Sequence, residues 1–224
     1  MSFAVALDGP AGAGKSTMAK LLAAKLDAVY IDTGAMYRAM AIYMLDNGVD
    51  GDDLAGVKES CTDADITIGR ENGEQRVFLN GTDVTGRLRE EAVGNMASKV
   101  SRVAEVRERL VALQRQLAAK QPSVMDGRDI GTVVLPNAEL KIYLTADPHV
   151  RALRRYKELA EKGEEGDIEQ IEADIIARDK QDMEREVSPL KQAEDAVLLD
   201  SSGLTIEEVT EKMLSLCRER GLCG

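Results

Sequence analysis

The sequence predicts an α/β fold in which a five-stranded parallel sheet lies between two layers of helices, and three observations support this prediction. Short apolar runs of strand type alternate along the chain with longer segments in which apolar residues recur at helical spacing. The segments between successive strands are long enough for the crossover helices that parallel strands require. The first strand also leads directly into a glycine-rich loop and a helix, an order that is typical of phosphate-binding folds.

The first strand, loop and helix carry a phosphate-binding motif. Residues 3–7 are an apolar run, and the segment after the loop has apolar residues at helical spacing, Met18, Leu21, Leu22 and Leu26. The loop matches the pattern G-x-x-x-x-G-K-[ST] with Gly9, Pro10, Ala11, Gly12, Ala13, Gly14, Lys15, Ser16 and Thr17. The motif favours the three-layer fold of P-loop NTPases, and a flexible Gly/Ala turn before a helix is the alternative interpretation.

Each residue type in this loop has a physical reason. Small residues let backbone N–H groups turn inward around a polyphosphate, and the following helix directs its positive end at the same anion. Lys15 is expected to supply a mobile charge to the β- and γ-phosphates, and the hydroxyl of Ser16 to reach a magnesium ion. The loop therefore predicts the binding of ATP together with Mg²⁺.

A second strand and a second helix are expected after this unit. Residues 28–32 are a short apolar run that ends in a carboxylate, which predicts a strand. Thr33 is expected to cap a helix that runs to the stop signal at residues 47–48. Its apolar residues are Met36, Met40, Ile42, Tyr43 and Leu45.

A change of pattern then indicates antiparallel structure. Residues 66–68 and 76–79 are of strand type, residues 71–74 contain Asn-Gly between them, and Asn-Gly recurs at residues 80–81. We therefore expect residues 62–88 to form a small inserted β-rich subdomain.

The rest of the chain returns to alternating helices and strands. Apolar spacing predicts one long helix over residues 90–119, with Ser98 and Arg107 on its polar face. We expect strands at residues 123–126, 140–144 and 196–200, and helices at residues 148–162, 167–186 and 205–220. The first two of these helices are charged, and Gly163 and Gly166 lie between them.

The composition and net charge indicate which class of ligand the chain binds. The formal net charge is -11, from 40 acidic and 29 basic residues, which argues against a surface for nucleic acid polymers and favours a small ligand. The 44% hydrophobic content suffices for the core of a single domain, and with no Trp and 2 Phe that core must consist of Ala, Leu, Val, Ile and Met. We expect a monomer.

The cysteines and the N-terminal residues indicate the cellular environment that we expect for the protein. Cys61, Cys217 and Cys223 are an odd number without regular spacing and there is 1 His, so neither a disulfide framework nor a His/Cys metal site is indicated. The N-terminal residues lack the pattern of a signal peptide, and no apolar run approaches the roughly 18 residues of a membrane span. We therefore expect a cytoplasmic protein that binds no membrane.

The arginines are the next candidates for chemistry. Arg178, Asp182 and Arg185 are four and three apart and should share one helix face, where a solvated salt-bridge ladder is the alternative. Residues 128–129 are a charged pair on a tight loop at the expected ligand edge of the sheet, unless they form a plain surface turn. Arg38 lies on the second helix, and the alternative interpretation is that its charge is simply exposed on the surface of that helix.

The motifs that the sequence lacks narrow the class of reaction. The sequence has no N-K-x-D guanine-reading element and no apolar strand ending in Asp-Glu, which disfavours switch GTPases and many motor-type ATPases. The single histidine, His149, has no base-and-nucleophile arrangement near it, and a surface role is favoured. These features fit an acceptor that is itself a phosphate, because its second pKa near 6 leaves it largely ionised at neutral pH. Such an acceptor needs arginine side chains to neutralise its charge, and it does not need a general base.

Four motifs taken together resemble the bacterial cytidylate kinase family, and the resemblance covers nearly the whole chain. They are residues 9–17, residues 32–38 (Asp-Thr-Gly-Ala-Met-Tyr-Arg), residues 126–134 (Asp-Gly-Arg-Asp-Ile-Gly-Thr-Val-Val), and residues 178–190 from Arg178-Asp179 to Ser188-Pro189-Leu190. The resemblance implies that the insert at residues 62–88 is a monophosphate-binding subdomain and that the helix pair at residues 148–186 is a lid.

The resemblance also implies roles for individual residues. Lys15, Arg38 and Arg128 would be catalytic, and the two arginines would hold the acceptor phosphate with Thr33 near the nucleotide. The base would be surrounded by Ser98, Arg107, Asp129 and Arg185, and the pentose would contact Arg178 and Asp182.

Base chemistry agrees with these roles. Cytosine offers an N4 amino donor that a carboxylate such as Asp129 accepts, and O2 and N3 acceptors that suit arginine. Uracil reverses the pattern at N3 and C4, so such a site should prefer CMP over UMP by leaving polar groups unpaired with the wrong base.

The expected function is reversible transfer of the ATP γ-phosphoryl group to CMP or dCMP, within pyrimidine nucleotide metabolism, with Mg²⁺ held through Ser16. Two alternatives remain open. One is a P-loop kinase for another small acceptor, such as UMP or a metabolite alcohol. The other is a nucleotide sensor that binds without turnover.

Overall fold

The computed structural model describes residues 3–71, 74–161 and 163–223, and the chain divides into two compact units. The sheet unit comprises Met1–Tyr30 and Lys120–Gly224, and the hairpin unit comprises Ile31–Ala119. Each unit is described separately below.

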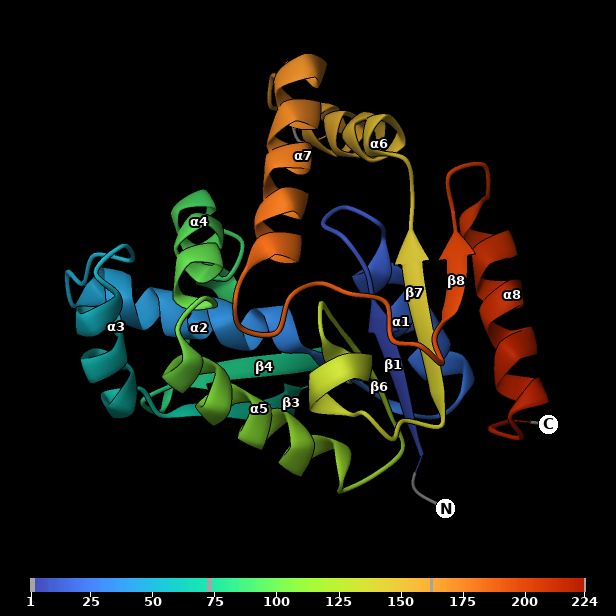
Figure 1. Ribbon diagram of the computed structural model, residues 1–224, viewed down its shortest axis with the longest axis horizontal. Coiled ribbons are helices and arrows are strands. Elements are labelled where there is room, and N and C mark those ends of the chain that lie inside the picture. The colour runs from blue at the N-terminus through green and yellow to red at the C-terminus, as the bar shows by residue number, and fades with distance from the viewer. Residues whose placement is uncertain (1–2, 72–73, 162, 224) are drawn as a thin grey trace. The chain divides into compact units, whose positions relative to one another are not determined.

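A five-stranded sheet lies at the centre of the sheet unit (Figure 1). Parallel pairing joins β1 to β6 and to β7, and β7 to β8. In spatial order the strands are β2 (Val29–Asp32), β6 (Ser123–Gly127), β1 (Ala4–Asp8), β7 (Leu140–Thr145) and β8 (Val197–Asp200). The expected five-stranded parallel sheet is confirmed.

The apolar core of the sheet unit forms where α1 (Lys15–Lys25) and α8 (Ile206–Glu219) pack on the sheet. α8 begins at a capping box in which Thr205 and Glu208 satisfy each other's backbone N–H groups. The core is made of small and medium apolar side chains, including Val5, Leu7, Leu22, Val124, Leu140, Ile142, Leu144, Val209 and Met213. This composition confirms the core expected from the scarcity of aromatic residues.

Two helices and a short helical turn complete the sheet unit. α6 (Pro148–Glu161) packs against α7 (Ile168–Glu184), as Figure 1 shows. A π-helical turn, η3 (Ile130–Val134), follows β6 and contacts β1 and β6.

Arg185 does not continue α7, so the expectation that it shares a helix face with Arg178 and Asp182 is wrong. Its ψ angle is 141°, because the chain turns back immediately after the helix. The turn is held by Arg185 Nε, which donates to the carbonyl of Ser188 at 2.6 Å, and by the N–H of Leu190, which donates to the carbonyl of Asp182 at 2.8 Å. Burial of Leu190 favours this turn over a further helical turn.

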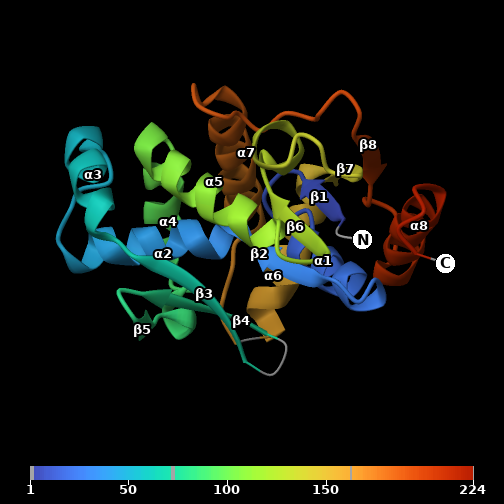
Figure 2. The same ribbon diagram turned by 90° about the horizontal axis from the view of Figure 1, so that it is seen from below.

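The hairpin unit contains an antiparallel three-stranded sheet (Figure 2). β3 (Ile66–Glu71) pairs with β4 (Glu74–Leu79), and β4 pairs with β5 (Thr82–Asp83). The expected antiparallel hairpin is thus present, and the expected turn residues Asn72 and Gly73 lie outside the described residues. The second turn has φ angles of 48° at Asn80 and 79° at Gly81, which explains the Asn-Gly pair there.

Helices pack against this small sheet. α2 contacts β4 and α4, and α5 contacts α2 and α3. The helices are α2 (Thr33–Asp46), α3 (Leu54–Ser60), α4 (Glu91–Val100) and α5 (Ala104–Ala118), with the single turns η1 (Cys61–Asp63) and η2 (Thr85–Arg87). The cap of α2 is Asp32, whose side chain accepts from the N–H of Ala35, and Thr33 is the first helical residue instead of the expected cap.

The single helix expected over residues 90–119 is wrong, because the chain breaks it at residues 101–103. The hydroxyl of Ser101 donates to the carbonyl of Ser98 at 2.9 Å, which competes with helix continuation. Val103 is buried in an extended conformation and is the N-cap of α5. The break also changes the environment of Arg107, which is buried instead of lying on a polar face.

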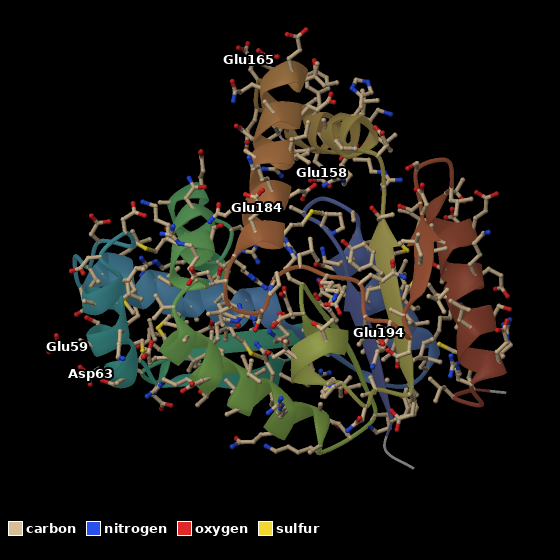
Figure 3. The ribbon with its side chains drawn as sticks, viewed as in Figure 1. Glu59, Asp63, Glu158, Glu165, Glu184 and Glu194 are labelled. Carbon is tan, nitrogen blue, oxygen red and sulfur yellow. The ribbon has the colours of Figure 1, made fainter. Side chains whose placement is uncertain are left out.

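Acidic side chains are prominent on the surface of both units. Figure 3 labels six that are exposed, Glu59, Asp63, Glu158, Glu165, Glu184 and Glu194. Cys61, Cys217 and Cys223 are free thiols. Within residues 3–71, 74–161 and 163–223, none of the helices combines the length and the apolar character that a bilayer crossing requires.

Candidate active site

The phosphate-binding loop runs from the end of β1 to the start of α1. A Cβ atom on Gly9, whose φ is 149°, would lie 1.9 Å from the carbonyl oxygen of Leu144, so only glycine fits where the loop leaves the sheet. Gly14 is the N-cap of α1 with a φ of 85°, a left-handed conformation that favours glycine. These glycines bring the loop close to β7 and direct it into the helix, as the motif predicts.

Lys15 is buried in this loop, and its ammonium group donates to the carbonyl of Pro10 at 2.7 Å. Burial and the positive charge of Arg128 lower the pKa of Lys15 to about 7, although three nearby carboxylates act in the opposite direction. A phosphate bound beside this amine would favour its charged form. The loop thus holds its lysine within reach of an anion.

A carboxylate lies beside the hydroxyl of Ser16. Asp126, the fourth residue of β6, is buried, and its Oδ2 accepts from Ser16 Oγ at 3.1 Å. Its Oδ1 accepts from the hydroxyl of Tyr30 at 2.9 Å, which orients the group. A hydroxyl and a carboxylate are the oxygen ligands that Mg²⁺ prefers, so the residues present fit that ion.

Asp8 joins β1 to the turn after β6. Its two carboxylate oxygens accept the N–H groups of Ile130 and Gly131, each at 2.7 Å. Burial raises the pKa of Asp8 to about 6, and the hydrogen bonds of these two amides limit the rise. This side chain therefore fixes the segment that follows Arg128 and Asp129.

Two arginines and two carboxylates gather beside the loop. Arg128 Nε donates to Asp182 Oδ2 at 2.8 Å, and Arg185 lies 3.7 Å from Asp129 and 3.9 Å from Asp182. Burial would raise the pKa of Asp182, but the charge and hydrogen bond of Arg128 outweigh it and lower that pKa. Arg178 also lowers it, which places its charge in the same cluster.

A second ion pair links α6 and α7 to the phosphate-binding loop. Buried Arg151 donates from Nη1 to the carbonyl of Ala11 at 2.8 Å, and its Nη2 lies 2.7 Å from Asp179 Oδ2. Asp179 Oδ1 accepts from the N–H of Ala11 at 3.3 Å. Both backbone groups of one loop residue are therefore held by the helix pair.

The remaining predicted residues lie in the hairpin unit. Thr33 and Arg38 are on α2, and the guanidinium of Arg38 lies over Gly34, where a Cβ atom would be 3.2 Å from its Nη1. Arg107 on α5 donates to the carbonyl of Ser101 at 3.2 Å, and its guanidinium carbon is 5.4 Å from the ring centroid of Tyr37. Ser98 is near the end of α4.

Comparison with known proteins identifies the family. A family model described as cytidylate kinase matches residues 5–219. The chain belongs to the cytidylate kinase family.

Curated members of the family from several bacteria are similar over almost their whole length. The cytidylate kinase of Caldicellulosiruptor bescii is 52% identical over 212 residues, covering 95% of this chain and 94% of that protein. The cytidylate kinase of Streptococcus pneumoniae is 49% identical over 217 residues, covering 96% and 97% respectively.

Solved structures share the fold at much lower identity. A gluconokinase from Sinorhizobium meliloti has a TM-score of 0.52 at 13% identity and covers 98% of this chain and 94% of its own. An uncharacterized protein from Eubacterium ventriosum has a TM-score of 0.56 at 10% identity, with 98% and 99% covered. These likenesses support the α/β fold.

In the structure, the predicted site residues fall into two groups, one in each unit. Residues 9–17 lie in the sheet unit with Arg128, Asp129, Arg178, Asp182 and Arg185, and the hairpin unit holds Thr33, Arg38, Ser98 and Arg107. Residue patterns alone assigned no role to Asp8, Asp126, Arg151 or Asp179. Asp8 and Asp126 lie at the carboxyl ends of neighbouring parallel strands, a position that could have marked them as site residues.

Proposed function

We propose that this chain transfers the γ-phosphoryl group of ATP to CMP and dCMP, which yields ADP and CDP or dCDP. Membership of the cytidylate kinase family over residues 5–219 is the observation that carries the proposal. In the reaction an oxygen of the acceptor phosphate forms a bond to the γ-phosphorus while the bond to the bridging oxygen of ADP breaks.

The phosphate-binding loop is assigned to ATP. Residues 9–17 surround the polyphosphate, and Lys15 neutralises charge on the β- and γ-phosphates. Ser16 and Asp126 would hold Mg²⁺, which when bound would add positive charge beside the phosphate oxygens. The hydrogen bond between these two side chains supports that assignment.

Arginines are assigned to the acceptor phosphate. Arg38 and Arg128 bind it, with Thr33 near the nucleotide, and their charge offsets repulsion between donor and acceptor. No general base is required, because the acceptor phosphate is largely ionised at neutral pH. The ion pair between Arg128 and Asp182 supports this role, since it holds the guanidinium close to the loop before the acceptor arrives.

Cytosine selection is assigned to four side chains. Asp129 accepts the N4 amino group, and Ser98, Arg107 and Arg185 complete the surroundings of the base, while Arg178 and Asp182 bind the pentose. The short separation of Arg185 from Asp129 supports pairing of a donor and an acceptor on one base edge. A base with the reversed pattern leaves these buried groups unpaired.

One segment is assigned as a lid and another as the monophosphate-binding subdomain. Residues 148–186 act as a lid hinged at Gly163 and Gly166, and residues 62–88 act as the monophosphate-binding subdomain. Lid closure follows acceptor binding and keeps water from the γ-phosphate. The test is ATP hydrolysis without acceptor, which is expected to be much slower than transfer to CMP; equal rates would refute the gating.

A cellular setting and an oligomeric state are part of the proposal. We assign the protein to the cytoplasm as a monomer that acts in pyrimidine nucleotide metabolism and binds neither membranes nor nucleic acid polymers. Light scattering of the purified protein tests the monomer, because a dimer would double the measured mass.

The deciding experiment is a panel of acceptors. Purified protein with ATP and Mg²⁺ is tested for ADP release with CMP, dCMP, UMP, AMP and GMP. Strong turnover on CMP and dCMP alone supports the proposal. Preference for UMP or for an alcohol points to a different P-loop kinase, and binding of ATP and CMP without turnover points to a nucleotide sensor.

A further inference from the structure

We propose that Asp8 is a positioning residue, which holds the loop at residues 127–131 in the geometry that selects cytosine. The proposal rests on the proposed function, because it concerns the acceptor side of that reaction. Asp8 itself is the last residue of β1, directly before the phosphate-binding loop.

Asp8 accepts hydrogen bonds from the backbone N–H groups of two successive residues. The N–H groups of Ile130 and Gly131 begin the turn η3, where a helical turn leaves its first donors without internal partners. Each donates to a different oxygen of Asp8 at 2.7 Å. Asp8 satisfies both donors in a buried environment, so its loss would leave them unpaired.

The same turn fixes Asp129. The carbonyl of Asp129 accepts the N–H groups of Val133 at 2.9 Å and Val134 at 3.1 Å, so its backbone moves with η3. A Cβ atom on Gly131 would lie 3.3 Å from Asp8 and 3.1 Å from the Lys141 side chain, so the turn packs closely against Asp8. Displacing Asp8 therefore displaces Asp129 and, next to it, Arg128.

Burial makes the charged form of Asp8 unfavourable where it lies. Burial raises the pKa of Asp8 to about 6. The charged and titratable groups around it are Asp129 after β6, Lys15 on α1, and Tyr143 and Lys141 on β7. A carboxylate supplies two acceptors in one plane, whereas an amide in its place offers one acceptor and one donor.

The test compares Asp8→Asn with the unchanged protein. The variant turns an N–H donor toward one of the two amides, and the displaced loop should raise the KM for CMP about tenfold and lower the preference for CMP over UMP about tenfold. The KM for ATP should stay within about twofold. The matched control is Asp200→Asn, at the end of β8, whose carboxylate holds the N–H and hydroxyl of Ser202 and which should change none of these values.

The outcomes separate this proposal from the proposed function. If the unchanged protein shows no preference for CMP, the proposed function fails whatever the variant does. If the unchanged protein prefers CMP but Asp8→Asn slows all acceptors equally, or raises the KM for ATP as much as that for CMP, the positioning role is overturned.

If Asp8→Asn does not fold, a measurement on the unchanged protein tests the positioning role of Asp8. The preference for CMP over UMP should fall as the pH drops through about 6. The two acceptors carry the same phosphate, so its own titration near 6 cancels in their ratio. A ratio that stays constant from pH 5 to 8 would overturn the proposal.

Discussion

Ser16 donates a hydrogen bond from its hydroxyl to Asp126 Oδ2 across 3.1 Å, although the two residues are 110 positions apart in the chain. The contact joins the end of the phosphate-binding loop to β6, the strand that pairs with β1. The two side-chain oxygens that we propose as ligands for Mg²⁺ therefore lie together.

The first prediction concerns this pair. Asp126→Asn should lower kcat about a hundredfold and raise the Mg²⁺ concentration that gives half-maximal activity, because one negative ligand is lost. A magnesium titration of ADP release measures both values. The control is Tyr30→Phe, which removes the hydrogen bond that orients the carboxylate but keeps its charge, and should cost only a few-fold. Unchanged magnesium dependence in Asp126→Asn would rule out the assignment.

The second prediction concerns Lys15. Lys15→Ala should reduce transfer by at least about a hundredfold, because its charge on the phosphates is lost. The free energy of unfolding should not fall, since burial disfavours this ammonium group and lowers its pKa to about 7. Activity assays and urea denaturation measure the two quantities. Lys25→Ala, an exposed lysine in the last turn of the same helix, serves as the control and should leave activity intact.

The third prediction tests how the base is recognised. Asp129→Ala should lose most turnover on CMP while turnover on UMP falls less, so the preference between them should shrink about tenfold or more. Steady-state kinetics with both acceptors measures the ratio. Glu184→Ala, an exposed carboxylate at the end of α7, should leave the ratio unchanged. An equal loss on both acceptors in Asp129→Ala would contradict base recognition by this carboxylate.

The fourth prediction concerns the ion pair that holds Ala11. Arg151→Ala leaves the carboxylate of Asp179 without its partner and should lower the free energy of unfolding by about 3 kcal/mol. Arg151→Ala combined with Asp179→Ala should recover part of that loss, because no unpaired charge remains. Urea denaturation of the single and double variants gives the coupling. The exposed pair of Arg155 and Glu158 is the control, and Arg155→Ala should cost less than about 1 kcal/mol. Additive losses in the double variant would mean that the pair is not coupled.

The fifth prediction concerns pH and stability. The pKa of Asp8 is raised from its ordinary value of 3.8 to about 6, so the folded state holds this proton to higher pH than the unfolded state. Its contribution to stability is therefore fully present below about pH 4 and is lost as the pH rises through about 6. Relative to Asp8→Asn, the unchanged protein should lose about 2 kcal/mol of unfolding free energy between pH 4 and pH 7. Urea denaturation at both pH values measures the difference, and a difference that does not vary with pH would contradict the raised pKa.

Local patterns in the sequence were sufficient for the order of elements. Apolar runs of period two or of helical spacing specify whether a segment is a strand or a helix, because each must bury one face. The Asn-Gly pair at residues 80–81 and the glycines of the phosphate-binding loop specify turns, because they adopt conformations that other residues avoid. The resemblance to the cytidylate kinase family that the sequence shows rests on the same local motifs.

Some helix boundaries did not follow from periodicity. Apolar spacing continues across residues 101–103, yet the chain bends there because Ser101 bonds back to Ser98 and Val103 is extended and buried. Arg185 leaves α7 for a similar reason, since contacts with Ser188 favour a turn. α3 was not expected either, and its N-cap Asp53 was the signal that could have found it.

What the sequence by itself determined was therefore the phosphate-binding loop, the alternation of strands and helices, and the residue types available to a site. Only the tertiary structure decided which of those residues meet, Asp8 with Ile130 across 122 positions and Ala11 with Asp179 across 168. The physical reason is that these contacts depend on the order of β6, β1 and β7 in the sheet and on where α6 and α7 pack. Strand order is set by burial and pairing of the whole chain, and no local pattern of residues specifies it.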